Sequence, residues 1–412
     1  MAVLVCWATN TGRKRKSADA PLQQKRGETE TMTCSNPNLV EMGRGRPKFL
    51  GPYMAYAAKH KDTQRLIEAG KLIQVPCGRC EECAKNRAEN WGTRCELEAK
   101  YYDQSLFVTL TYANEHLPVY NAFEKRTYRG LKNPVDFEIK GKTYERGTLY
   151  KRDLSLFLKK LNMDAVRKGY SETGKSCRYY ACGEYGGKRH RPHYHVIIFG
   201  LHPPDLEVDR VAKDGKKPII HYKSKWLAEK WGMGLVDIEE ANYGSARYVA
   251  GYATKKHKDA ELYEYLGIDK PYTVMSRMPG IGYQYWNDNR DEIYKEWADK
   301  VYLKSGKTVK PPRYFDRKED ELHLAEEAAE KGENAPVNSE EETEESEAVT
   351  AVKKSEFMKK LSQKRREFAT GSRQTELQKT TVTPEEYLQI KHATMVKSPG
   401  YISLSRRDRV DD

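Results

Sequence analysis

The chain has 412 residues, 38% of them hydrophobic and 32% charged, enough for one large domain or two ordinary ones without stabilising cross-links. No apolar run approaches the roughly 18 residues of a membrane span, and the opening MAVLVCWA is too short for the apolar part of a signal peptide, so we expect no membrane association. The formal net charge of +13 favours an acidic partner, most often nucleic acid.

The two ends of the chain differ in composition from its middle. Residues 1–31 are polar and basic without periodicity, which predicts a disordered leader. Residues 32–315 read as one folded domain, and residues 316–412 as a charged, largely disordered tail. Within the tail, residues 319–347 hold 13 acidic residues and one lysine, a block that either remains solvated or covers a basic groove when nucleic acid is absent.

A cysteine-rich segment lies at residues 73–100. Cys77, Cys80 and Cys83 follow the pattern Cys-x₂-Cys-x₂-Cys, and Cys95 comes twelve residues later. Clustered cysteines of this kind are unlike a secreted disulfide framework and indicate a reducing compartment. Four thiolates can hold a tetrahedral Zn²⁺, so structural zinc is one expectation. An iron–sulfur cluster fits less well, because Arg87 stands where the ferredoxin run has its next cysteine, and unliganded thiols remain open.

The middle of the chain predicts alternating strands and helices. SLFVTLTY, residues 105–112, has the two-residue period of a strand. Residues 150–169 place leucine and phenylalanine at helical spacing. RYYACGEYG and HYHVIIFG predict two strands of an antiparallel hairpin around the turn GKRHRP. SARYVAGYATKK, residues 245–256, predicts a helix.

His193 and His195 lie two residues apart on the second hairpin strand, so both imidazoles point to the same side. Glu184, across the turn, can bring a carboxylate to them, although His190 in the turn is a rival ligand. Two imidazoles and one carboxylate leave coordination positions open, and mixed nitrogen and oxygen donors suit Mg²⁺ or Mn²⁺ in phosphate chemistry. The alternative is a strand end whose polar residues face water.

Tyr248 and Tyr252 are four residues apart in the predicted helix, hence on one face, and Lys255 follows on that side. A phenol has a pKa near 10 and attacks a phosphate poorly unless a cation helps, which the lysine and a metal ion can both do. The alternative is that both tyrosines only pack the helix. Thr109 and Thr111, on the first strand, are expected to support the sheet beneath the site rather than take part in the chemistry.

Taken in order, FVTLTY, GEYGGKRHRPHYHVIIFG and YVAGYATKK resemble the three motifs of HUH rolling-circle replication initiators. The pair Tyr-x-x-x-Tyr followed by lysine is similar to the initiators of microviruses, small icosahedral single-stranded DNA phages. The cysteine run and SRMPGIGYQYW, residues 276–286, resemble segments of the gokushovirus branch. The resemblance covers residues 32–315 and implies an α+β fold, with a central antiparallel sheet and flanking helices, related to ferredoxin-like folds.

The resemblance also implies a function. Glu184, His193 and His195 would bind the divalent metal, and Tyr248 or Tyr252 would attack the scissile phosphate of the viral origin, as single-stranded or replicative double-stranded DNA. The products would be a 5′-phosphotyrosine and a 3′-OH that a host polymerase extends in the bacterial cytoplasm. The second tyrosine would then cut the regenerated origin, and the freed 3′-OH would close the circle.

A host helicase is an expected further partner. Gly306-Lys307-Thr308 resembles the end of a phosphate-binding loop, but Val301 stands where that loop needs its first glycine. We therefore predict no ATP-driven helicase in this chain.

Two other functions remain open. A zinc-dependent nucleic-acid-binding regulator would need neither tyrosine and would form no covalent adduct with DNA. A relaxase or transposase of the HUH superfamily would keep the site but cut a different DNA sequence.

Overall fold

The computed structural model describes most of the chain between residues 34 and 377. The described residues are 34–41, 48–78, 80–121, 126–129, 137–139, 142–144, 147–187, 189–214, 217–258, 260–295, 300–304, 306–331 and 355–377. The predicted disordered leader at 1–31 lies outside them. Among the described residues, no helix is both long and apolar enough to cross a membrane.

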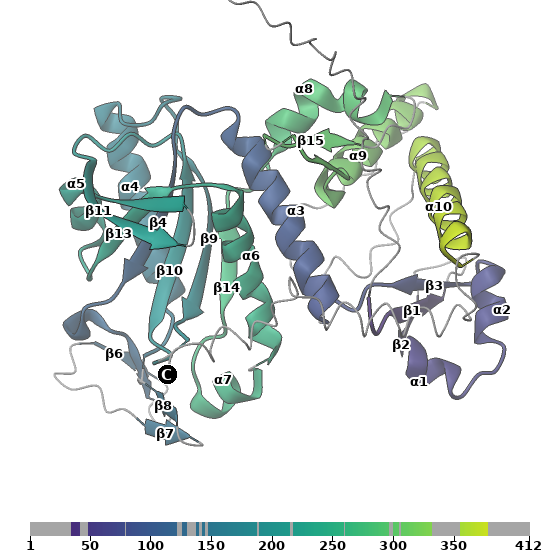
Figure 1. Ribbon diagram of the computed structural model, residues 1–412, viewed down its shortest axis with the longest axis horizontal. Helices are drawn as coiled ribbons and strands as arrows, with labels where there is room; N and C mark the ends of the chain where they lie inside the picture. The colour runs from purple at the N-terminus through teal and green to yellow at the C-terminus, as the bar shows by residue number, and fades with distance from the viewer. Residues whose placement is uncertain are drawn as a thin grey trace, which may run out of the picture.

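A seven-stranded antiparallel sheet forms the centre of the fold (Figure 1). Its strand order is β11-β12-β13-β4-β10-β9-β14. In chain order the strands are β4 (Ser105–Thr111), β9 (Arg178–Tyr185), β10 (Pro192–Phe199), β11 (Glu207–Asp214), β12 (Lys217–Lys223), β13 (Val236–Glu240) and β14 (Tyr272–Met275). The predicted first strand, the predicted hairpin and the α+β class with its central antiparallel sheet are confirmed.

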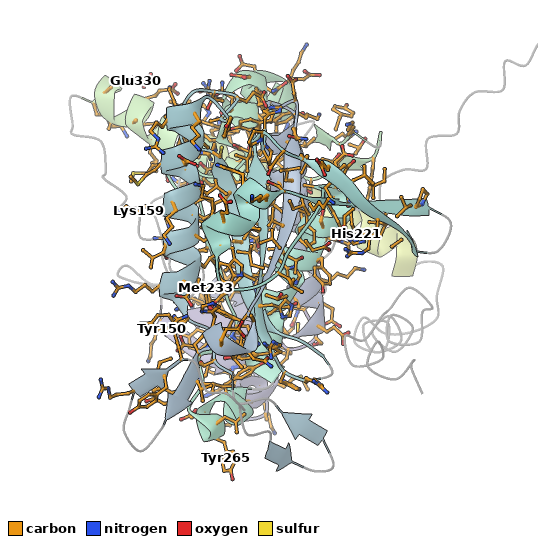
Figure 2. The ribbon with its side chains drawn as sticks, turned by 90° about the vertical axis from the view of Figure 1, so that its left-hand side faces the viewer. Tyr150, Lys159, His221, Met233, Tyr265 and Glu330 are labelled. Carbon is orange, nitrogen blue, oxygen red and sulfur yellow. The ribbon has the colours of Figure 1, made fainter. Side chains whose placement is uncertain are left out.

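One face of the sheet packs on α4 (Lys151–Lys168) and α5 (Lys225–Trp231). In α4, Leu154, Phe157 and Leu161 are buried at helical spacing, as the sequence predicts. The basic residues between them face solvent, and Lys159 points away from the sheet in Figure 2. Leucine and valine side chains of β4 alternate toward this face and fill the largest hydrophobic cluster.

The opposite face packs on α3 (Glu81–Ala99) and α6 (Tyr243–Lys258). The two helices contact each other along their length, and α6 also lies against β9, β10 and β14 (Figure 1). The predicted helix at 245–256 is therefore confirmed within α6. Because strand residues alternate between faces, the odd-numbered residues of β10, including both histidines, point to this second face.

Shorter elements surround the sheet. They are the 3₁₀ turn at Asn114–His116, α7 (Ala260–Leu266), α8 (Tyr283–Tyr294), and the two-stranded pairs β5 (Val119–Asn121) with β6 (Arg126–Tyr128), β7 (Phe137–Ile139) with β8 (Lys142–Tyr144), and β15 (Val301–Tyr302) with β16 (Thr308–Val309). Thr308 lies in a β-hairpin strand and not at the start of a helix, where a phosphate-binding loop would place it.

Residues 34–78 form a small unit that we call the N-terminal module. It contains a three-stranded sheet, order β2-β1-β3, and two short helices. The bounds are β1 (Asn38–Glu41), β2 (Lys48–Pro52), α1 (Tyr53–Ala57), α2 (Thr63–Glu68) and β3 (Leu72–Val75). In Figure 1 the module lies beyond the N-terminal end of α3, away from the central sheet.

Part of the segment predicted to be a disordered tail is helical. The boundary placed at residue 315 falls inside α9 (Arg313–Glu330), and α10 (Glu356–Leu377) follows later. Phe315 and Leu324 of α9 and Leu361 of α10 are buried, the first and last of them in a hydrophobic cluster with α8. The many charges of these segments concealed apolar residues at helical spacing. Residues 332–354 and 378–412 lie outside the described part.

Candidate active site

The β9–β10 hairpin brings together the three residues that the sequence singles out as metal ligands. In its register, His193 lies opposite Glu184, and His195 lies opposite Cys182 on the same face. We call Glu184, His193 and His195 the His–Glu cluster. Their ligand atoms lie within 4.8 Å of one another, close enough to share one ion.

Glu184 connects the two imidazoles. Its Oε1 lies 2.7 Å from Nε2 of His193 and 3.0 Å from Nε2 of His195. The Glu184 and His195 side chains are 3% and 7% exposed, whereas His193 is 16% exposed and forms the open side of the cluster. Burial would raise the pKa of the Glu184 carboxyl, but hydrogen bonds and charge from the two histidines outweigh it and leave this pKa below its ordinary value.

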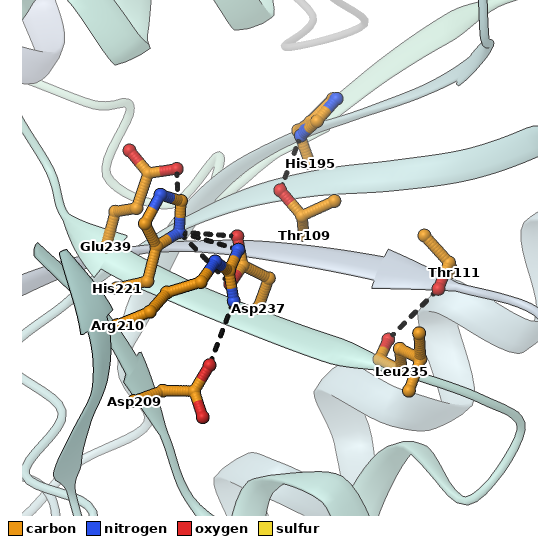
Figure 3. Close-up of polar contacts among 9 residues, drawn as sticks. All are labelled: Thr109, Thr111, His195, Asp209, Arg210, His221, Leu235, Asp237 and Glu239. Atoms are coloured by element: carbon orange, nitrogen blue, oxygen red, sulfur yellow. Dashed lines mark hydrogen bonds and ion pairs between the residues drawn. The ribbon is translucent and has the colours of Figure 1, made fainter. Parts of the chain in front are cut away.

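Each imidazole is also held through its other ring nitrogen. Nδ1 of His193 lies 3.1 Å from the carbonyl oxygen of Arg191. Nδ1 of His195 lies 3.0 Å from Oγ1 of Thr109 on the neighbouring strand β4 (Figure 3). A carbonyl at Nδ1 of His193 fixes the proton there and leaves the Nε2 lone pair available to an ion.

Thr109 therefore does more than the sequence indicated. We expected it to support the sheet, and it contacts a candidate ligand directly. Thr111, two residues along the same face, instead directs its hydroxyl to the carbonyl of Leu235, at 3.5 Å (Figure 3). The signal for Thr109 was its place in a strand that pairs with β10, but a pairing register cannot be read from the sequence of one strand.

Tyr248 lies over the His–Glu cluster from α6. Its ring centroid is 5.2 Å from that of His195 and 6.4 Å from that of Phe107, both in edge-on contacts. Val249 and Ala250, the next residues, are fully buried against the sheet and fix the helix there. Tyr248 itself is 40% exposed, so its phenol lies between the cluster and solvent.

Tyr252 and Lys255 belong to the same helix. α6 continues to Lys258, which places Tyr252 one turn after Tyr248 and Lys255 in the turn after that. Their side chains lie outside the described part of the structure.

The cysteines cluster as the sequence suggests, with one exchange. Cys77, Cys80 and Cys83 are joined by Cys34, and the four sulfur atoms lie within 4.8 Å of one another. Cys95 is not in this group. Because α3 is continuous from Glu81 to Ala99, the twelve residues from Cys83 carry Cys95 about 18 Å along the helix. Cys95 is instead buried among apolar side chains, and this burial raises the pKa of its thiol.

A further polar group lies on the same sheet face, on β12 and β13. His221, Asp237 and Glu239 offer ligand atoms within 4.8 Å of one another. However, Nη2 of Arg210 lies 2.9 Å from Asp237 and 3.1 Å from Nδ1 of His221 (Figure 3). The guanidinium already supplies positive charge to this group, so we assign it to an ionic network.

Comparison with known proteins places these elements in a family. The family described as replication-associated protein ORF2 matches residues 105–257, which include β4, β9, β10 and nearly all of α6. The replication-associated protein ORF2 of Spiroplasma virus 4 is 35% identical over 266 residues, which cover 61% of this chain and 70% of that protein.

Two other relatives match over smaller shares of their own lengths. The replication-associated protein VP4 of Bdellovibrio phage phiMH2K is 28% identical over 58% of this chain and 65% of its own length. The replication-associated protein ORF4 of Chlamydia phage 1 is 30% identical over 44% of this chain and 38% of its own length. No solved structure matches the chain. The chain belongs to the family of phage replication-associated proteins, as its ordered motifs indicate.

Proposed function

We propose that this protein is a metal-dependent endonuclease that initiates rolling-circle replication by nicking one strand of the viral origin. The observation that carries the proposal is the position of Tyr248, whose partly exposed ring lies beside His195 of the His–Glu cluster. A nucleophile beside a cluster of potential metal ligands is the arrangement that tyrosine-mediated DNA cleavage requires. The relatives' names, all replication-associated proteins of phages, support the same conclusion.

The His–Glu cluster fits Mg²⁺ or Mn²⁺. Glu184 supplies a carboxylate oxygen, and the Nε2 atoms of both histidines converge on it. The ion, when bound, would neutralise charge on the scissile phosphate. Glu184, buried and shared by both imidazoles, sets the spacing of the ligands, and the more exposed His193 leaves the side from which a phosphate can approach.

In the proposed reaction, the phenolic oxygen of Tyr248 or Tyr252 bonds to phosphorus as the bond from phosphorus to the 3′ oxygen breaks. The phenol gives up its proton, and the leaving 3′ oxygen gains one. Lys255 would stabilise the phenolate. One phosphodiester replaces another, so the step needs no ATP.

The remaining steps follow from these products. A host polymerase would extend the 3′-OH while a host helicase separates the strands, in the cytoplasm of the bacterial host. The second tyrosine would cut the regenerated origin, and the released 3′-OH would attack the first phosphotyrosine and close the circle. Arg189 and Arg191, in the turn between β9 and β10, lie at the end of the sheet that carries His193 and are suited to contact DNA phosphates.

A direct test is to incubate the protein with a labelled library of single-stranded phage origin sequences and Mn²⁺, and then to sequence the DNA that stays attached after denaturation. We expect a covalent adduct that requires the divalent ion and is enriched in one origin sequence. Binding without any adduct would favour a zinc-dependent regulator. An adduct on unrelated sequences would favour a relaxase or transposase.

Thr109→Val removes a hydroxyl at nearly constant volume and should weaken activity at limiting Mn²⁺ by about 10- to 100-fold, the usual effect of losing a contact that orients a metal ligand. Thr109→Ser, which keeps the hydroxyl, should restore most of the activity. Thr111→Val is the matched control, because the Thr111 hydroxyl contacts the Leu235 carbonyl and not a ligand. The Mn²⁺ dependence of nicking measures all three. Equal losses in Thr109→Val and Thr111→Val would contradict a specific role for the contact with His195.

A further inference from the structure

Four cysteines meet where the N-terminal module joins α3. Cys34 precedes β1, and Cys77 follows β3, so both belong to the module. Cys80 is the residue before the first turn of α3, and Cys83 lies within that turn. We call these four residues the cysteine cluster, and we propose that they form a structural zinc site that fastens the module to α3. This site is separate from the His–Glu cluster and does not depend on the proposed nuclease activity.

The sulfur positions fit one tetrahedral ion. The Sγ atoms of Cys77 and Cys83 are 4.0 Å apart, and those of Cys34 and Cys80 are 3.7 Å apart. With Zn–S bonds of about 2.3 Å, sulfur atoms at the corners of a tetrahedron are about 3.8 Å apart. The two separations lie on either side of that value. All four sulfurs lie within 4.8 Å of one another, as ligands of a single ion must.

The backbone around the cluster is arranged for thiolate sulfur. The Cys77 amide donates to Sγ of Cys34 at 3.3 Å, and the Cys80 amide donates to Sγ of Cys77 at 3.2 Å. Gly78 makes the tight turn between them with a φ of +72°. Arg87 of α3 holds this turn through a hydrogen bond from Nη2 to the Gly78 carbonyl, 3.1 Å long. Amide donors and a nearby cation offset the negative charge that four thiolates would concentrate there.

Other occupants fit the cluster less well. A disulfide needs its sulfurs about 2.05 Å apart and would use only two of the four. All four are free cysteines at longer separations. In an iron–sulfur cluster the thiolates bind different iron atoms and are spread more widely than ligands of one ion. Four sulfur donors with no oxygen donor among them favour Zn²⁺ over Mg²⁺ or Mn²⁺.

The module has a reason to need such a link. Its buried apolar side chains are few, chiefly Leu39, Val40 and Leu72. None of the residues 34–78 belongs to the three hydrophobic clusters found among the described residues. A unit of this size with so small a core requires a metal, a disulfide or a partner to remain folded. Two ligands from the module and two from α3 would supply that connection.

The decisive experiment compares Cys34 with Cys95 in the full-length protein. Metal analysis of protein purified without chelator should give about one equivalent of zinc per chain. Cys34→Ser should lose most of it, and Cys34→His, which offers another zinc ligand, should recover part. Cys95→Ala is the matched control: Cys95 is a buried thiol of α3 outside the cluster, so this variant should keep the full equivalent. Limited proteolysis should cut the module faster in Cys34→Ser than in Cys95→Ala.

A second measurement covers the possibility that Cys34→Ser folds poorly. Zinc in the wild-type protein can be exchanged for Co²⁺, whose absorption reports the geometry and the number of thiolate ligands. A tetrahedral spectrum with four thiolates supports the site. Wild-type protein without zinc, iron in place of zinc, a Cys34→Ser variant that keeps the full equivalent, or a spectrum with fewer thiolates would each overturn the proposal.

Discussion

Replacing both His193 and His195 with alanine should abolish DNA cleavage while leaving the fold and most of the DNA affinity in place. The imidazoles serve the charge of one phosphate, whereas affinity comes mainly from the many lysine and arginine contacts that a chain of net charge +13 can make. A bound divalent ion contributes several kcal/mol to the transition state, so the loss in rate should be about 10³-fold or more. Adduct formation and filter binding on the same oligonucleotide separate the two effects.

The double variant leaves Glu184 buried without its two histidines, which could destabilise the fold. Adding Glu184→Gln removes that buried charge and gives a triple variant of nearly the same volume. His202→Ala is the control, because His202 pairs with Glu172 on an exposed surface far along the chain from the hairpin turn. Full cleavage by the double variant, with chelator making no difference, would exclude the metal assignment.

The elements that carry the candidate site could be predicted because their patterns are local. The two-residue period of β4 and β10 and the Gly/Pro turn between β9 and β10 are readable within a few residues, and the hairpin then places Glu184 opposite His193. The helical spacing of α6 likewise placed Tyr248 and Tyr252 on one helix. The order of the strands in the sheet was beyond reach, because it depends on contacts between distant segments.

The same distinction explains what sequence reasoning missed. Cys34 is 43 residues from Cys77, and only the pairing of β1 with β3 brings them together. Cys95 looked suitable by spacing alone, but a continuous helix carries it away from Cys83. The contact of Thr109 with His195 likewise needs the pairing of β4 with β10. In each case the missing information was tertiary.

Changing both Tyr248 and Tyr252 to phenylalanine should eliminate the covalent adduct entirely, whereas each single variant should still form some. Residues four apart on a helix have their Cβ atoms about 6 Å apart, close enough for either phenol to reach a phosphate beside the His–Glu cluster. Phenylalanine keeps the ring, so the contact of Tyr248 with His195 should survive and the helix should stay in place. Tyr243→Phe, on the same helix, is the control and should form the adduct as the wild type does.

Closing a full circle should suffer far more in the single variants than the first nick does. After the first cut one tyrosine is occupied by the 5′ end of the DNA, so the second cut, at the regenerated origin, needs a free phenol at the same site. An enzyme with one remaining tyrosine can start replication but has no nucleophile left with which to end it. Nicking of a short origin oligonucleotide and release of closed circles from a plasmid origin measure the two stages separately. Mass spectrometry of the adduct peptide locates the bond: DNA attached to a tyrosine other than Tyr248 or Tyr252, or an adduct that persists in the double variant, would show that the nucleophile lies elsewhere. Equal losses in nicking and circle closure would argue against alternation between the two phenols.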